Sequence, residues 1–171
     1  MNKKPIYLGI AATTLDGRIA LNSHHFSNWT SKEDKEFLHA ILDTCDLILV
    51  GNSTYKMAKK PLSKRNCLVF THSLSNKTSL SNLVYINPAK QSVKKYIEKM
   101  KYKRVGILGG AQIYSYCLAN KLLNELYLTI EPISFGVGIS LFETKKQTRW
   151  QLKSVKKLNR QGSLLLRYLK K

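Results

Sequence analysis

Short apolar runs bounded by polar or glycine-containing segments recur along the whole chain. Runs of this length with few charges are typical of strands buried on both faces of a sheet. Apolar and polar residues alternate over 125–133, which predicts a further strand with Pro132 at an edge or bulge. Two late segments, 150–155 and 163–169, flank a turn at 159–162 and predict a hairpin. The buried strands are expected at 6–12, 46–50, 67–70 and 105–108, and a further short strand is expected at 83–86.

Helical apolar spacing separates these strands. The clearest helix follows Thr30 or Ser31, either of which is a good N-cap, and has Asp34 in its first turn. Further helices are expected after the glycine turn at 51, from 87 to 100, and from 111 to about 120, while 73–82 is expected to be a surface loop. This order predicts one α/β domain over residues 1–171. Its central sheet should be mostly parallel, with an antiparallel C-terminal hairpin and helices on both faces.

Three of the predicted strands end in segments suited to phosphate binding: 51–54, 71–73 and 109–113. Bare glycine backbone allows a phosphate to approach, and the free N–H groups of a helix N-terminus attract anions. Gly109–Gly110 taken by itself is equally typical of an ordinary strand–helix turn. Because ligands of α/β sheets bind beyond the carboxyl ends of the strands, the coincidence of three such ends favours a nucleotide.

The charge balance raises a second possibility. The chain carries 29 lysines and arginines against 10 acidic residues, a formal net charge of +19. Clustered cations would indicate nucleic-acid binding, whereas a solvated basic surface would merely attract anionic small molecules. The cations are spread along the chain and accompany no recognised nucleic-acid motif. Nucleic-acid binding is therefore not expected to be the main function.

Other classes are disfavoured by simple counts. No apolar run approaches the roughly 20 residues needed to cross a bilayer, and the N-terminal segment has no signal-peptide pattern. Cys45, Cys67 and Cys117 lie in apolar surroundings and are expected to be free thiols in a reducing cytoplasm. His24 and His25 have no further ligand nearby, so no metal site is expected.

Six features follow one another along the chain: the segments 10–12 and 16–20, the pair Trp29 and Asp34, and the segments 51–71, 109–114 and 126–129. In this order they resemble the dihydrofolate reductase superfamily, which includes the reductase domain of riboflavin biosynthesis. Trp29 and Asp34 have the spacing of the tryptophan and the substrate-binding carboxylate in bacterial dihydrofolate reductases. The resemblance covers essentially the whole chain and implies that family's three-layer α/β fold.

The resemblance implies that NADPH is the cofactor and that the Gly109–Gly110 peptide bond is cis. The residues implied to bind the cofactor are Ala12, Ile19, Gly51, Asn52, Ser53, Thr54, Thr71, His72, Ser73, Gly109, Gly110, Ala111, Gln112, Ile113 and Tyr114.

The resemblance to the dihydrofolate reductase superfamily also implies a catalytic group. Asp34 would bind the amino-pyrimidine edge of the substrate, with Thr129 orienting the carboxylate and Trp29 helping to exclude water. Such a carboxylate makes the ring easier to protonate, which assists reduction of a C=N bond. By spacing alone, Asp34 is more typical of a first-turn helix carboxylate, and it is the presence of Trp29 and Thr129 that favours the catalytic role; Glu33 is its neighbouring rival. The implied substrate-binding residues are Ile10, Ala11, Asp34, Leu38, Arg65 and Thr129.

The expected substrate is a pterin, with dihydrofolate reduction as the main hypothesis and a ribosylamino-pyrimidine phosphate of the riboflavin pathway as the alternative. The paired-aspartate-proline segment of the riboflavin enzymes is absent, and 56–60 stands in its place. Asn52 and Gln112 occupy the positions of the arginines that usually bind the 2′-phosphate of the cofactor, so His72, Ser73 or a lysine would have to substitute. A basic binding module and a relative that has lost catalysis are the other hypotheses. The protein is expected to be a monomer or homodimer.

Overall fold

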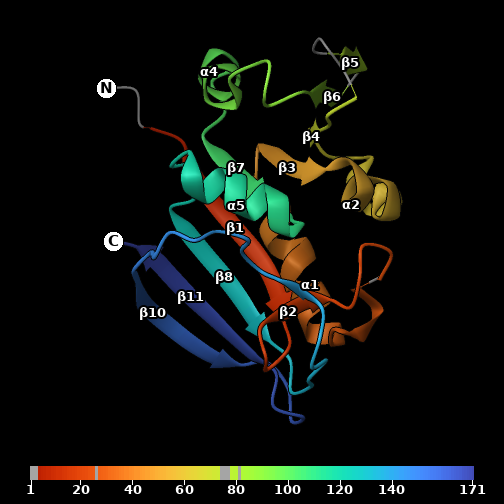
Figure 1. Cartoon of the computed structure of the whole chain (residues 1–171), viewed down its shortest axis with the longest axis vertical. Helices are drawn as coiled ribbons and strands as arrows, with labels where there is room; N and C mark the ends of the chain where they lie inside the picture. Colours follow the sequence, from red (N-terminus) through yellow and green to blue (C-terminus); the bar gives the residue numbers. More distant parts are fainter. Residues whose placement is uncertain (1–3, 26, 74–77, 81) are drawn as a thin grey trace.

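The computed structural model describes residues 4–25, 27–73, 78–80 and 82–171 and shows the α/β architecture expected from the sequence (Figure 1). The strands are β1 (Ile6–Thr13), β2 (Arg18–Ala20), β3 (Leu47–Gly51), β4 (Cys67–Phe70), β5 (Thr78–Leu80), β6 (Leu83–Ile86), β7 (Arg104–Ile107), β8 (Glu125–Ile130), β9 (Ile139–Ser140), β10 (Trp150–Lys157) and β11 (Leu164–Lys170). The helices are the 3-10 turn η1 (Ser27–Trp29), α1 (Lys32–Leu42), α2 (Asn52–Met57), α3 (Lys59–Leu62), α4 (Val93–Lys99) and α5 (Ala111–Ala119).

The main sheet has the strand order β10-β11-β8-β1-β7-β3-β4-β6-β5, and β2 pairs separately with β9. Six consecutive strands of this sheet run parallel to one another: β8, β1, β7, β3, β4 and β6. Strand β11 pairs antiparallel with β8. The predicted mostly parallel sheet with an antiparallel C-terminal hairpin is therefore confirmed. Strand β10 lies at one edge, and most of its residues are exposed.

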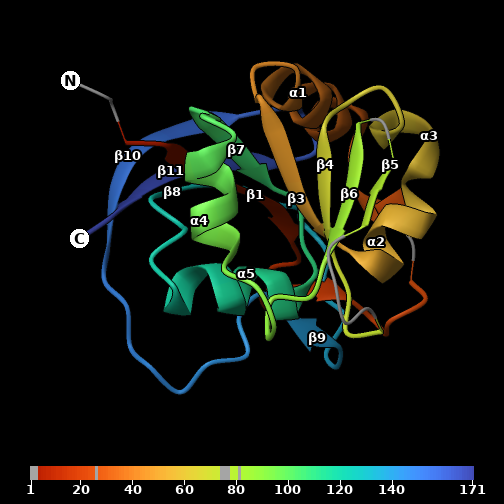
Figure 2. The same ribbon diagram turned by 90° about the horizontal axis from the view of Figure 1, so that it is seen from above.

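Helices cover both faces of the sheet, with α1 on one side and α4 and α5 on the other (Figure 2). Successive side chains of one strand point to opposite faces of the sheet and therefore pack against different helix layers. In β3, Leu49 packs into the core beneath α4 and α5, whereas its neighbour Ile48 packs into the core beneath α1. Because the central strands pack against helices on both faces of the sheet, they are continuous apolar runs in the sequence.

Helix α1 begins where the sequence predicted, because the Ser31 side chain accepts a hydrogen bond from the Asp34 N–H at 3.2 Å. The predicted helix from 87 begins only at Val93, with Ser92 as its N-cap. Asn87 instead forms a separate turn, in which its side chain accepts the Ala89 N–H at 3.0 Å. The proline at 88 therefore belongs to this turn.

Two further boundaries differ from the sequence prediction. Strand β8 ends at Ile130, before Pro132, which has no N–H to continue a ladder. Within the predicted surface loop at 73–82, Thr78–Leu80 forms β5 and pairs antiparallel with β6. A short edge strand can be held by backbone hydrogen bonds alone, so its sequence has no apolar pattern from which it could be predicted. Residues 74–77 and 81 of that loop lie outside the described residues.

Candidate active site

A cavity of about 1260 Å³ opens beyond the carboxyl ends of β1, β3, β4 and β7. Its position is the one expected for ligands of parallel α/β sheets. Two regions make up its wall. The glycine end comprises the turns after β3, β4 and β7, and the carboxylate end comprises the first part of α1, where Thr129 of β8 is hydrogen-bonded to Asp34.

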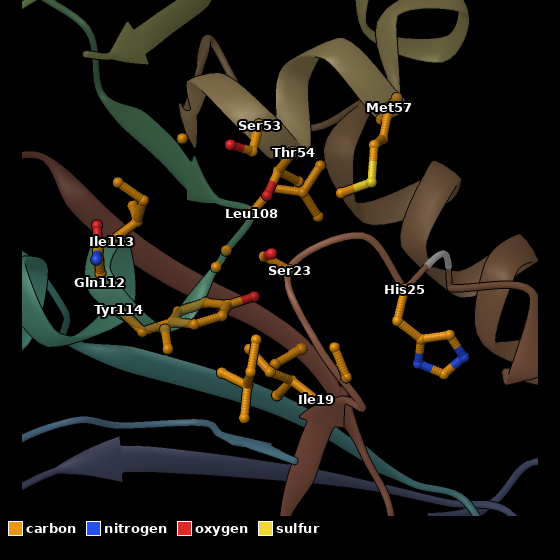
Figure 3. A pocket seen from close by; sticks show the side chains of 18 of the residues that line it. Ile19, Ser23, His25, Ser53, Thr54, Met57, Leu108, Gln112, Ile113 and Tyr114 are labelled. Carbon is orange, nitrogen blue, oxygen red and sulfur yellow. The ribbon is translucent and has the colours of Figure 1, made fainter. Parts of the chain in front are cut away.

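The structure brings all the predicted cofactor-binding residues to this one cavity. Figure 3 shows Ser53 and Thr54 near the start of α2, and Gln112, Ile113 and Tyr114 of α5, around the same space. The lining residues from the sequence prediction are Ala12, Ile19, Gly51, Asn52, Ser53, Thr54, Thr71, His72, Ser73, Gly109, Gly110, Ala111, Gln112, Ile113 and Tyr114.

Backbone geometry keeps the glycine end open. Gly109 has a φ of 58°, and a Cβ built there would lie 3.1 Å from the Tyr114 ring. A Cβ built on Gly110 meets nothing within 4 Å, so the space beside this residue is free. The Gly51 N–H donates to the Gly109 carbonyl at 3.2 Å and ties the two turns together. The peptide bond between Gly109 and Gly110 is cis, as the resemblance implied.

This arrangement fits a nicotinamide nucleotide. The open backbone at Gly110 leads into the N-terminus of α5, where the first N–H groups have no intrahelical acceptor and attract a phosphate. Tyr114 is buried and donates its hydroxyl to the Ile10 carbonyl at 2.5 Å, which joins α5 to β1 beneath the cavity. Burial raises the pKa of Tyr114, so the phenol stays protonated as this donor.

At the carboxylate end, Asp34 lines the cavity yet is only 7% exposed. Its carboxylate receives side-chain hydrogen bonds from Thr129 and Thr30. Burial raises the pKa of Asp34 above its usual range, and the two threonine hydrogen bonds offset only part of this shift. The predicted contact between Thr129 and the carboxylate is thus present.

Trp29 also lines the cavity and packs edge-on against Phe135, with ring centroids 5.2 Å apart. Its Nε1–H is buried and has no hydrogen-bond partner among the residues that the structure describes. A buried donor of this kind is available to a bound molecule or water. Ile10, Ala11 and Leu38 add the predicted apolar surface.

Thr129 and Arg65 are the exceptions among the predicted substrate-binding residues, because neither lines the cavity. Thr129 acts on it only through its hydrogen bond to Asp34, whereas Arg65 is held elsewhere. Its guanidinium pairs with Asp43 at the C-terminal end of α1 and also donates to the Pro61 carbonyl. It is not among the described residues that line the cavity. The reason is topological: Arg65 precedes β4, so it lies at the end of that strand opposite the cavity.

Several lining residues were not predicted. Lys35 follows Asp34 directly and also faces the cavity, and its charge acts on the Asp34 carboxyl group. His25 was expected in an exposed loop, but it accepts the Leu21 N–H at 3.0 Å and packs against Phe135 in the wall. The neighbour relation to Asp34 could have revealed Lys35, whereas no local signal identifies the others. These are Ala20, Asn22, Ser23, Asn28, Thr30, Met57, Ala58, Phe70, Pro88, Leu108, Tyr116, Ile139 and Glu143.

Among the described residues, no helix is long and apolar enough to cross a membrane. The same part of the chain contains no group of three or more histidine, cysteine or acidic side chains that could hold a metal ion. Cys45, Cys67 and Cys117 are free thiols.

The fold, with a buried carboxylate and an open glycine turn at one cavity, is that of the dihydrofolate reductase-like proteins. The family model for dihydrofolate reductase matches residues 8–168, and the chain belongs to this family.

Relatives and similar structures agree with this assignment. The uncharacterized protein YwjB of Bacillus subtilis (strain 168) is 27% identical over 154 residues, which cover 85% of this chain and 87% of that protein. A pyrimidine reductase-like protein of Corynebacterium diphtheriae superposes with a TM-score of 0.79 at 17% identity, over 98% of this chain and 92% of that one.

A bifunctional protein of Thermotoga maritima shares the fold as well. It is a diaminohydroxyphosphoribosylaminopyrimidine deaminase/5-amino-6-(5-phosphoribosylamino)uracil reductase, and it superposes with a TM-score of 0.76 at 16% identity. The match covers 98% of this chain but only 57% of the Thermotoga chain.

Proposed function

We propose that the protein is an NADPH-dependent reductase of a phosphorylated amino-pyrimidine, a substrate of the riboflavin-biosynthesis type. The observation that carries this choice is that the neighbouring residues Asp34 and Lys35 both line the cavity, while Arg65 is held at the opposite end of its strand. A carboxylate suits an amino-pyrimidine edge, and a neighbouring ammonium suits one anionic substituent. The similar folds of pyrimidine reductase-like proteins support the same substrate class.

Each residue at the carboxylate end has a definite part in this reaction. The bound nicotinamide would supply a hydride to the carbon of a C=N bond, and solvent water would supply the proton that the nitrogen takes up. Asp34 would bind the amino and ring N–H groups of the pyrimidine and hold it in one orientation, with Thr129 fixing the carboxylate. Trp29 and Leu38 would exclude bulk water, which strengthens these charge-assisted hydrogen bonds.

The glycine end supplies the cofactor site in this proposal. Gly110 and the first turn of α5 would hold the pyrophosphate. Asn52, His72, Ser73 and Gln112 line the cavity and offer neutral or titratable donors for a 2′-phosphate. The buried free thiols Cys67 and Cys117 are consistent with action in a reducing cytoplasm.

Dihydrofolate reduction is the second candidate. The match to the dihydrofolate reductase family model and the grouping of Asp34, Thr129 and Trp29 favour it. Against it stands Arg65, whose pairing with Asp43 leaves the glutamate tail of dihydrofolate without the predicted arginine.

A substrate panel separates these candidates. The purified protein would be given dihydrofolate, a dihydropterin without the tail, and the riboflavin-type pyrimidine with and without its phosphate, each with NADPH and with NADH. We expect oxidation of NADPH with the phosphorylated pyrimidine and little with dihydrofolate. Turnover of dihydrofolate without turnover of the pyrimidine would establish the second candidate. If no substrate is reduced, a titration of cofactor fluorescence distinguishes a relative that has lost catalysis from a basic binding module with no nicotinamide site.

A further inference from the structure

A second buried carboxylate lies behind the carboxylate end. Glu131 directly follows β8 and is 3% exposed. Its Oε1 accepts the Ser31 N–H at 2.8 Å and the Ser31 hydroxyl at 2.8 Å. Its Oε2 accepts the Ser163 hydroxyl. Glu131 does not line the cavity, so it has no direct contact with a ligand there.

The donors around Glu131 match an ionised carboxylate, which is an acceptor at both oxygens. Among the described residues, no lysine, arginine or histidine forms an ion pair with it. The negative charge of Glu131 is stabilised instead by the N-terminus of α1, where backbone N–H groups and the helix dipole favour an anion. Glu131 therefore lies where its charge is stabilised by the same helix turn that carries Asp34.

Ser31 links the two carboxylates. While its hydroxyl donates to Glu131, its oxygen accepts the Asp34 N–H at 3.2 Å. The Asp34 side chain is tied in turn to Thr129, two residues before Glu131. Residues two apart along an extended chain point to the same face, so β8 and its continuation hold α1 at two points.

The C-terminal hairpin supports the same turn from the other side. Asn159 donates through Nδ2 to the Ser163 hydroxyl at 2.9 Å and to Glu33 at 3.2 Å, and its Oδ1 accepts the Gly162 N–H at 3.0 Å. The loop between β10 and β11 is thereby fastened to the first turn of α1. These bonds, together with those of Glu131, leave Ser31 and Asp34 little freedom to shift relative to the sheet.

We propose that Glu131 is a positioning residue for the reduction, which fixes the first turn of α1 through Ser31 and places a second negative charge behind Asp34. This inference rests on the proposed function only for its effect on turnover. Its structural and electrostatic consequences exist in the protein without any ligand.

The electrostatic consequence has a definite sign. Burial is the main cause of the raised pKa of Asp34, and the negative charge of Glu131 raises the pKa further. The Thr129 and Thr30 hydrogen bonds and the positive charge of Lys35 act in the opposite direction. Tyr114 also interacts with Asp34, but it is a neutral phenol at physiological pH. Removing the charge of Glu131 must therefore lower the pKa of Asp34.

Two substitutions separate charge from position. Glu131→Gln keeps the length of the side chain and can still accept from Ser31, but it removes the charge. Glu131→Asp keeps the charge but is one methylene shorter, so it should lose contact with Ser31 or Ser163. Glu125→Gln is the matched control, because Glu125 is a buried carboxylate at the far end of the same strand and pairs with Arg167.

The primary measurement is a carbon-13 NMR titration of the Asp34 carboxyl group in the ligand-free protein, with the signal assigned by Asp34→Asn. We expect Glu131→Gln to lower the Asp34 midpoint by roughly half a pH unit or more and Glu125→Gln to leave it unchanged. Glu131→Asp should change the midpoint less, but it should speed hydrogen exchange of the Asp34 amide. An Asp34 midpoint that is the same in the wild type and Glu131→Gln, together with unchanged exchange in Glu131→Asp, would overturn the proposal.

Turnover supplies the second readout once a substrate is found. Glu131→Asp should lower kcat about tenfold with little change in KM, because a displaced carboxylate affects the reacting geometry more than ground-state binding. Glu131→Gln should mainly shift the acid limb of the pH profile downward. Failure of the proposed function would leave the NMR result intact, so the two failures are distinguishable. Unchanged kinetics in both variants would overturn the role of Glu131 in the reaction.

Discussion

The two ends of the cavity are built in different ways. The glycine end is made of backbone: strand ends, tight turns and a helix N-terminus, with each part contained in a short stretch such as 109–114. The carboxylate end is made of side chains that meet across the chain. Ser31 and Glu131 are 100 residues apart in sequence, and Glu33 and Asn159 are 126 apart.

This difference implies different sensitivities to substitution. At the glycine end, the important property is empty space beside the backbone, so adding atoms should do the damage. At the carboxylate end, it is the charge and position of a few polar groups, so isosteric changes that leave volume intact should be the most informative. The predictions below test this contrast, from the largest expected effect to the smallest.

Gly110→Val should abolish binding of NADPH, weakening the dissociation constant by roughly 100-fold or more. The φ of Gly110 is −78°, and an added Cβ meets no protein atom within 4 Å, so the variant should fold and fill only the cradle. Fluorescence titration measures the binding, and Gly110→Ala should show a smaller loss. A folded Gly110→Val protein that binds NADPH like the wild type would place the cofactor elsewhere.

Asp34→Asn should lower the hydride-transfer rate at neutral pH by about 10²–10⁴-fold, the range typical of general acid–base groups. The shape is kept and the charge is lost. In the wild type, the raised pKa means that binding by the ionised carboxylate weakens as the pH falls through that raised value. Asp34→Asn should lack this transition and recover in part at acid pH, where the substrate itself is protonated.

Single-turnover kinetics across the pH range test this prediction. The matched control is Asp43→Asn, which removes a carboxyl group at the other end of α1, outside the cavity. Equal losses in the two variants would show that the effect is not specific to the cavity.

Lys35→Met should raise KM about tenfold for the phosphorylated pyrimidine and leave the unphosphorylated form nearly unaffected, because it removes one charge-assisted interaction. Lys32→Met is the control, since Lys32 is on the same helix but is highly exposed and paired with Glu36. Initial-rate measurements on both substrates decide the outcome. An equal effect on the two substrates would exclude a phosphate contact by Lys35.

Added salt should slow the capture of NADPH by roughly threefold between low and high ionic strength, because the Debye length shrinks from about 10 Å at 0.1 M to about 3 Å at 1 M. The net charge of +19 is the source of this attraction. Stopped-flow fluorescence gives the association rate. Tight binding to duplex DNA with a steep salt slope and no effect of NADPH would instead favour a basic binding module.

The contrast between the two ends also explains what could be predicted from the sequence. The sheet, the helix after Ser31 and the glycine turns leave local patterns, and the structure contains them. His25 and Glu131 leave none, because their surroundings arise only when distant segments pack together. Arg65 shows the opposite error: its family motif is matched, but Asp43 lies within reach of its guanidinium and binds it away from the cavity.

Part of the positive charge lies on the exposed edge strand β10, where it opposes aggregation of the protein. An open edge presents unpaired N–H and C=O groups on which another molecule can add a strand. Lys153, Lys156 and Lys157 line this edge, and the register shifts between Leu152 and Ser154, so the ladder available for docking is both charged and irregular. Two such edges repel each other, which discourages edge-to-edge aggregation even though Leu152 and Val155 of the same strand are exposed. Concentrated salt would weaken that protection, so the protein should be easiest to keep dispersed at low ionic strength.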